Sequence, residues 1–113
     1  MKDLQEVKLH ETFFKARDII RQVGFTRNMH CDPDTGSVDV EGAFLLALGV
    51  KKLPILVVDT DAVLPEVARG RFDACLVLVE SEVGDITEWV DKRATQAEVE
   101  KLLTRLGNEV AIA

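Results

Sequence analysis

The residues of this chain that are best placed to do chemistry lie between Asp32 and Glu41, a short stretch that is rich in carboxylates. Within it, residues 34–37 (Asp-Thr-Gly-Ser) match the active-site tetrapeptide of aspartic proteases, in which two carboxylates share one proton in a dry loop between strands. A retroviral-type protease is of similar length and works as a homodimer, so one such motif per chain would suffice. Here the preceding residues 29–33 are polar and contain a proline, and the chain lacks the alternating strands of an all-β fold. We therefore interpret the tetrapeptide as turn chemistry.

The same stretch offers oxygen ligands for a cation. Its carboxylates are Asp32, Asp34, Asp39 and Glu41. An EF-hand loop counted from Asp32 needs Gly at its sixth position and Glu at its twelfth, but Ser37 and Ala43 stand there instead. We interpret the stretch as a solvated acidic turn, with a looser cation site as the alternative, and we expect neither a bound metal nor a cofactor.

Histidine and cysteine also supply a formal set of zinc ligands, namely His10, His30, Cys31 and Cys75. Their spacing is wrong for a zinc site because His30 and Cys31 are adjacent and the others are far apart. Cys75 lies in an apolar run, where a small core residue is the simpler role. A nucleophile pair of Cys31 with His30 is also disfavoured, because neighbouring residues on a strand rarely point the same way.

The single tryptophan, Trp89, lies two residues before Asp91. Packing against the last helix is the simpler role for Trp89, and an anchor for a partner is the alternative, because exposed tryptophan often dominates interfaces. Trp89 and Asp91, together with the carboxylates of the acidic turn, are the residues that we expect to bind a partner.

Charge is distributed unevenly along the chain. Residues 1–31 carry six Lys or Arg against four Asp or Glu, residues 32–91 carry four against thirteen, and residues 92–113 carry four against three. The acidic middle repels phosphate backbones, which argues against nucleic-acid binding and allows a basic protein partner. The first residues are charged, without the apolar core of a signal peptide, and no apolar run approaches the ~20 residues that span a bilayer. We therefore expect no membrane association, a cytoplasmic protein and reduced thiols.

Two helices are indicated by apolar spacing and by their end residues. Residues 3–23 have apolar side chains mostly three, four or seven apart, and Gly24 ends this helix. Asp39 can cap a nearly all-apolar helix over residues 40–48, which Gly49 ends. Such a helix belongs at the centre of the core.

The middle of the chain has two interpretations, whereas its end has one. Residues 95–98 (Thr-Gln-Ala-Glu) form a capping box that opens an amphipathic C-terminal helix. The apolar runs at residues 55–58 and 74–79 read as two parallel strands joined by a helix. Alternatively, residues 65–83 form one helix with a proline in its first turn and a glycine that costs about 1 kcal/mol.

Three short motifs bear on this choice. They are an opening helix that ends at Gly24 before Phe25, a Gly-Ser-Val-X-Val-X-Gly-Ala segment at residues 36–43, and a Trp-X-Asp step at residues 89–91 followed by Thr-X-X-Glu-Val at residues 95–99. Together they resemble a small uncharacterised family of proteins from actinobacteria and their phages. The middle Asn of that family's usual Trp-Asn-Asp step is Val here. The resemblance implies an all-helical fold, and hence helix in the ambiguous middle, but it implies no activity.

We therefore predict a mainly α protein, a small single-domain helical bundle over residues 1–113, with α/β as the alternative. The leading functional hypothesis is a non-enzymatic module, encoded by a phage or mobile element, that acts by binding a protein partner. The apolar centre of so small a chain adds a homodimer as a second expectation. The alternative is a small hydrolase or metal-dependent enzyme that uses the loop from Asp32 to Glu41.

Overall fold

A computed structural model describes residues 4–27, 31–50, 66–92 and 94–112 of the chain. Its helices, in chain order, are α1 (Leu4–Val23), α2 (Val40–Ala47), α3 (Glu66–Val83), α4 (Ile86–Lys92) and α5 (Gln96–Ile112). The described ranges contain no extended strand, only isolated bridges from Val38 to Phe25 and to Cys31. The predicted mainly α fold is thus confirmed.

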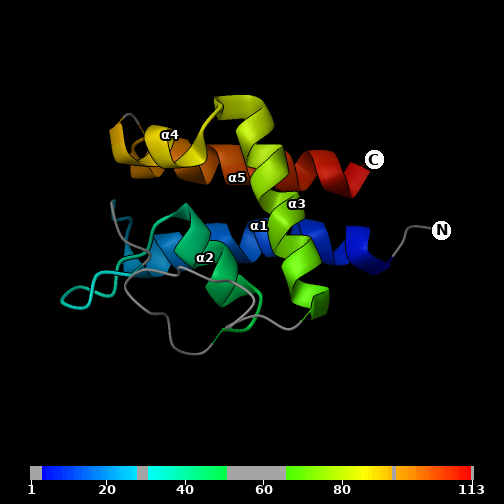
Figure 1. Cartoon of the computed structure of the whole chain (residues 1–113), viewed down its shortest axis with the longest axis horizontal. Coiled ribbons are helices and arrows are strands. Elements are labelled where there is room, and N and C mark those ends of the chain that lie inside the picture. The colour runs from blue at the N-terminus through cyan, green and yellow to red at the C-terminus, as the bar shows by residue number, and fades with distance from the viewer. Residues whose placement is uncertain (1–3, 28–30, 51–65, 93, 113) are drawn as a thin grey trace.

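Helices α1 and α5 share the most extensive contact among the described helices. They lie side by side and run in opposite directions, and α3 crosses over both of them (Figure 1). Their facing sides are apolar at helical spacing, which is why they join. The buried apolar residues of α1 are Phe13, Ala16 and Ile20, and those of α5 are Val99, Leu102, Leu103 and Leu106. This pair forms the frame on which the other helices pack.

The first helix ends at Gly24, as predicted. The amide of Gly24 donates a hydrogen bond to the carbonyl of Ile20 at 2.8 Å, and its φ of 95° is a left-handed value that glycine adopts without a Cβ clash. The chain then turns back, because Val38 donates to the carbonyl of Gly24 and Thr26 donates to that of Val38. The connector is therefore fastened to the end of α1.

The short helix α2 occupies the predicted position at the centre of the core. The Asp39 carboxylate accepts a hydrogen bond from the amide of Gly42 at 2.6 Å, which caps the helix. Phe44 is fully buried, and its ring meets Phe13 of α1 edge to face, with 5.7 Å between centroids. The cap fixes where α2 begins, and Phe44 fixes it to α1.

The third helix settles the ambiguity in the part of the middle segment that the structure describes. Residues 66–83 are helical, so the alternative of a strand at residues 74–79 is wrong. Buried side chains recur every three or four residues along α3, at Ala68, Phe72, Cys75 and Val79. One continuous buried stripe on a helix outweighs the local β preference of the branched residues. The other predicted strand, at residues 55–58, lies outside the described residues.

The last two helices each begin at a capping side chain. Asp85 accepts from the amide of Glu88 at 3.0 Å and opens α4, a helix that the sequence interpretation missed. The Thr95 hydroxyl accepts from the amide of Glu98 at 3.2 Å, which confirms half of the predicted capping box. The Glu98 carboxylate accepts from that same hydroxyl at 3.2 Å, not from a free amide, because a hydroxyl can donate and accept at once.

Candidate functional site

The acidic turn from Asp32 to Ser37 is held mainly by its own polar groups. The Asp32 carboxylate accepts from the amide of Asp34 at 2.8 Å, and the amide of Gly36 donates to the carbonyl of Asp32 at 2.9 Å. The Ser37 hydroxyl donates to the carbonyl of Val23 at 3.1 Å, which ties the turn to the end of α1. Asp34 is exposed at the turn. A proton-sharing pair of protease carboxylates needs a dry, rigid setting, whereas Asp34 is exposed to water.

The remaining carboxylates of the loop do not join a metal site. Asp39 caps α2, and Glu41 lies in the first turn of that helix. Within the described ranges, no three His, Cys, Asp or Glu side chains gather in a way that could hold a metal ion. The tertiary structure thus separates oxygen ligands that are close in the sequence.

The predicted binding residues Trp89 and Asp91 lie on α4. Trp89 is half-buried and packs against the apolar core. Its carbonyl accepts from the amide of Ala94 at 2.8 Å as the chain leaves α4. Asp91 is half-buried on the same short helix. Part of the indole remains accessible, so its role as a partner anchor stays a prediction.

The thiols and the described histidine have separate environments. Cys31 is half-buried, Cys75 is buried in α3, and both are free thiols. Burial raises the pKa of the Cys75 thiol from 9.0 to about 12, so this group stays protonated and is a poor nucleophile. His10 packs its ring edge to face against Phe14 at 5.9 Å between centroids. His30 lies outside the described residues.

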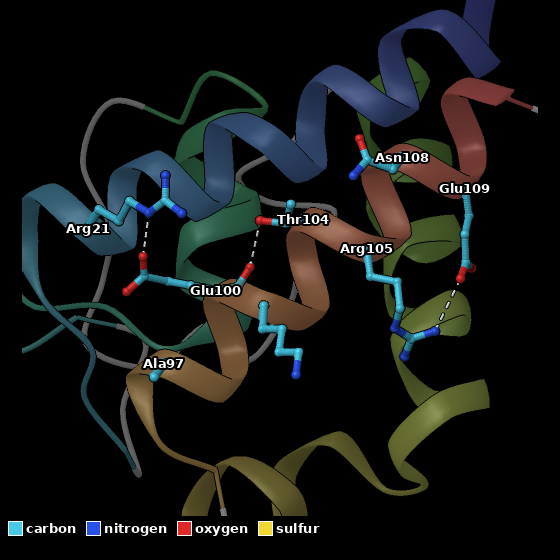
Figure 2. Close-up of a pocket in the computed structure, with 8 residues that line it drawn as sticks. Arg21, Ala97, Glu100, Thr104, Arg105, Asn108 and Glu109 are labelled. Carbon is cyan, nitrogen blue, oxygen red and sulfur yellow. Dashed lines mark hydrogen bonds and ion pairs between the residues drawn. The ribbon is translucent and has the colours of Figure 1, made fainter.

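An open groove of about 610 Å³ runs along the outer face of α5 beside α1 (Figure 2). Arg21 contributes from α1. The other lining residues come from α5 and are Ala97, Glu100, Lys101, Thr104, Arg105, Asn108 and Glu109. Their spacing of three and four residues places them along one side of the helix.

Ion pairs hold most of the charged groups of this groove. Figure 2 shows Glu100 reaching Arg21 across the interface between α5 and α1, and Arg105 reaching Glu109 along α5. Arg105 also donates to Glu82 of α3 at 3.0 Å. This hydrogen bond and the nearby charge of Arg105 lower the pKa of the Glu82 carboxyl. The paired side chains form a polar wall along the groove.

Sequence interpretation missed the groove, although a signal for it exists. The polar residues from Glu100 to Asn108 recur at spacings of three and four, but the same pattern is typical of any solvated helix face. What distinguishes this face is Arg21, whose partner Glu100 is 79 positions away in the chain. That pairing depends on the packing of α5 against α1.

Each helix that the structure describes is too short or too polar to cross a lipid bilayer.

Comparison with known proteins gives one match. The model of a family of unknown function, DUF6197, matches residues 5–109. No curated protein and no solved structure matches the chain. The family model spans the chain from the first turn of α1 nearly to the end of α5. The chain therefore belongs to the family of unknown function DUF6197.

Proposed function

We propose that this protein is a non-enzymatic interaction module that binds a protein partner in the groove along α5. The observation that carries the proposal is the groove itself, a hollow of about 610 Å³ that is open along its length. It extends from Ala97 to Glu109, which at about 1.5 Å per residue is roughly 18 Å of helix. A groove of this length between two helices suits a helix or an extended segment of a partner.

The charges of the groove indicate what the partner carries. Arg21 and Arg105 already have carboxylate partners in Glu100 and Glu109. Lys101 is exposed, and among the described residues it has no ion pair. A carboxylate on the bound segment would complement this ammonium group, while the paired residues set the register of the segment through hydrogen bonds. The proposed occupant is therefore a protein segment with an acidic side chain opposite Lys101.

Two pairs of matched variants test the groove. Lys101→Glu reverses the charge in the groove, and Lys92→Glu makes the same change on exposed α4. Asn108→Trp fills the groove, and Thr87→Trp adds the same side chain to α4. Immobilised wild type and variants are exposed to host lysate, and the retained proteins are identified by mass spectrometry.

The proposal requires one protein that both groove variants lose and both α4 variants retain, with unchanged thermal unfolding. Loss of roughly tenfold in retained partner is expected from replacing an attraction by a repulsion at a partly desolvated site. Loss on the α4 variants alone would contradict the groove and support Trp89 and Asp91 as the contact. Equal retention by all variants would contradict a partner in the groove.

The homodimer remains a proposal, and light scattering of the wild type and of Asn108→Trp examines it. A dimer that dissociates when the groove is filled would identify a second copy as the occupant and overturn a foreign partner. An origin in actinobacteria or their phages, and the location in the cytoplasm, also remain proposals that rest on the sequence. The enzymatic alternative at the loop from Asp32 to Glu41 stays a prediction.

A further inference from the structure

A second pocket, of about 320 Å³, lies where α1, the end of α2 and α3 meet. Glu11, Thr12 and Lys15 of α1 and Arg71 of α3 contribute side chains to it, and residues 47–49 at the end of α2 form another wall. Thr12 is buried, Arg71 is half-buried, and Lys15 and Glu11 are exposed. The pocket therefore has a polar inner wall and a charged mouth.

The guanidinium of Arg71 is the unusual group of this pocket. Its Nε–H is buried and lacks a hydrogen-bond partner. Every other arginine that the structure describes has an interaction partner, as Arg17 with Asp18, Arg27 with the carbonyl of Ala94, and the remainder show. Because Nε is closed to water, a ligand in the pocket can reach Arg71 only through its terminal nitrogens, which also carry N–H donors.

The balance of charge around the pocket favours an anion. Lys15 and Arg71 supply two cations, and neither has an ion pair among the described residues. The opposing groups are the Glu11 carboxylate, which is exposed and hence screened by water, and the partial negative charge at the end of α2.

We propose that this pocket binds an oxyanion, a carboxylate or a phosphate group, between Lys15 and Arg71. One oxygen accepts from the terminal N–H groups of Arg71 at the inner wall, and the ammonium group of Lys15 approaches from the mouth. Arginine suits this role because its planar fork matches the geometry of both groups. The site is separate from the groove along α5, so it stands independently of the proposed protein partner.

Titration of the isotope-labelled protein with sodium phosphate, and separately with sodium acetate, tests the site by NMR at constant ionic strength, with chloride as the reference. The Nε–H signal of Arg71 and the amide signals of Thr12 and Gly49 should shift and saturate together. Saturation with phosphate alone, or with acetate alone, would each support the site and identify the group that it accepts. Absence of saturation with either anion would overturn the proposal.

Variants separate a binding site from a merely structural arginine. Lys15→Gln changes an exposed residue and should keep the fold while weakening the binding roughly tenfold. Arg71→Gln should weaken it at least as much, and Lys101→Gln, outside the pocket, should leave it unchanged. Glu11→Gln should strengthen it several-fold, since it removes the opposing carboxylate. Binding that is unaffected by Lys15→Gln and Glu11→Gln would contradict the assignment whether or not Arg71→Gln folds.

Discussion

Gly107 sets how closely α5 approaches α1. A Cβ atom at this position would lie 2.5 Å from Cε1 of Phe14, well inside van der Waals contact. The ring of Phe14 has little freedom to move away, because it also meets His10 and lies 5.0 Å below the guanidinium of Arg17. Gly70 provides the contrast, since a Cβ atom there would meet nothing within 4 Å. The two glycines have the same helical backbone but opposite surroundings.

We expect Gly107→Ala to lower the free energy of unfolding by about 1–3 kcal/mol, because overpacking outweighs the better helix propensity of alanine. Gly70→Ala, the matched control, should raise it by about 0.5–1 kcal/mol. Urea unfolding followed by circular dichroism measures both. Stabilisation by both alanines would mean that the helices separate or the ring rotates at no cost.

The two cysteines should differ sharply in reactivity. Cys75 is buried and its pKa is raised to about 12, so at pH 8 it is a protonated thiol without access to reagent. Cys31 is half-buried and free. A disulfide reagent such as DTNB should modify Cys31 in the folded protein and reach Cys75 only after unfolding.

The raised pKa of Cys75 also makes the stability of the folded protein depend on pH. The neutral form is preferred in the folded state, so the contribution of Cys75 to stability is complete below pH 9 and declines as the pH rises toward 12. Cys31→Ser provides the control, in which no thiol of the folded protein should react. Rapid reaction of this variant at pH 8 would contradict the burial of Cys75.

At the scale of the element, the cap of α2 is the clearest local determinant. Replacing Asp39 by alanine removes the acceptor for the amide of Gly42 and should cost about 1 kcal/mol of stability. Asp34→Ala, an exposed change in the same loop, should alter stability by less than about 0.5 kcal/mol. Thermal and urea unfolding measure the pair.

The same loop decides between the two functional hypotheses. If Asp34→Asn abolished a hydrolytic activity in a protein that kept its helicity, the enzymatic alternative would be supported and the interpretation of residues 34–37 as turn chemistry would be wrong. If replacing Asp39 by alanine lowers stability as expected for a lost cap, and Asp34→Asn changes no activity, the loop is a structural turn.

Most helices were predictable because their determinants lie within a few residues. Caps such as Asp39, stops such as Gly24 and apolar spacing act locally, so they can be recognised without the fold. The short helix α4 was also signalled by Asp85 followed by Glu88, but its seven residues carry too little periodicity to stand out. The branched run at residues 74–79 suggested a strand although it is part of α3. Only the packing of that helix shows that one face of the run is buried.

At the scale of the whole molecule, α5 completes the core that the other helices begin. Its buried side chains are Val99, Leu102, Leu103 and Leu106. At about 1.5–3 kcal/mol each, their burial contributes on the order of 10 kcal/mol. That is comparable with the entire stability of a small domain, about 5–15 kcal/mol.

A chain that ends at residue 95 should therefore fail to fold cooperatively. Circular dichroism should show partial, non-cooperative helix, because the apolar face of α1 loses its cover. The full-length variant Lys101→Gln, changed only on the exposed face of α5, should unfold as sharply as the wild type. A cooperative transition in the shortened chain would show that the remaining helices form a sufficient core.

By itself, the sequence determined the mainly α class, the cap and burial of α2, the stop at Gly24 and the opening of α5. The caps and the stop depend on hydrogen bonds between residues a few positions apart, and the burial of α2 follows from its nearly all-apolar composition. Only the tertiary structure brings together the residues of the two proposed binding surfaces. The groove needs Arg21 beside Glu100, and the anion pocket needs Lys15 beside Arg71. Such pairs are brought together by helix packing over long chain separations, and a polar helix face looks the same in the sequence whether or not another helix borders it.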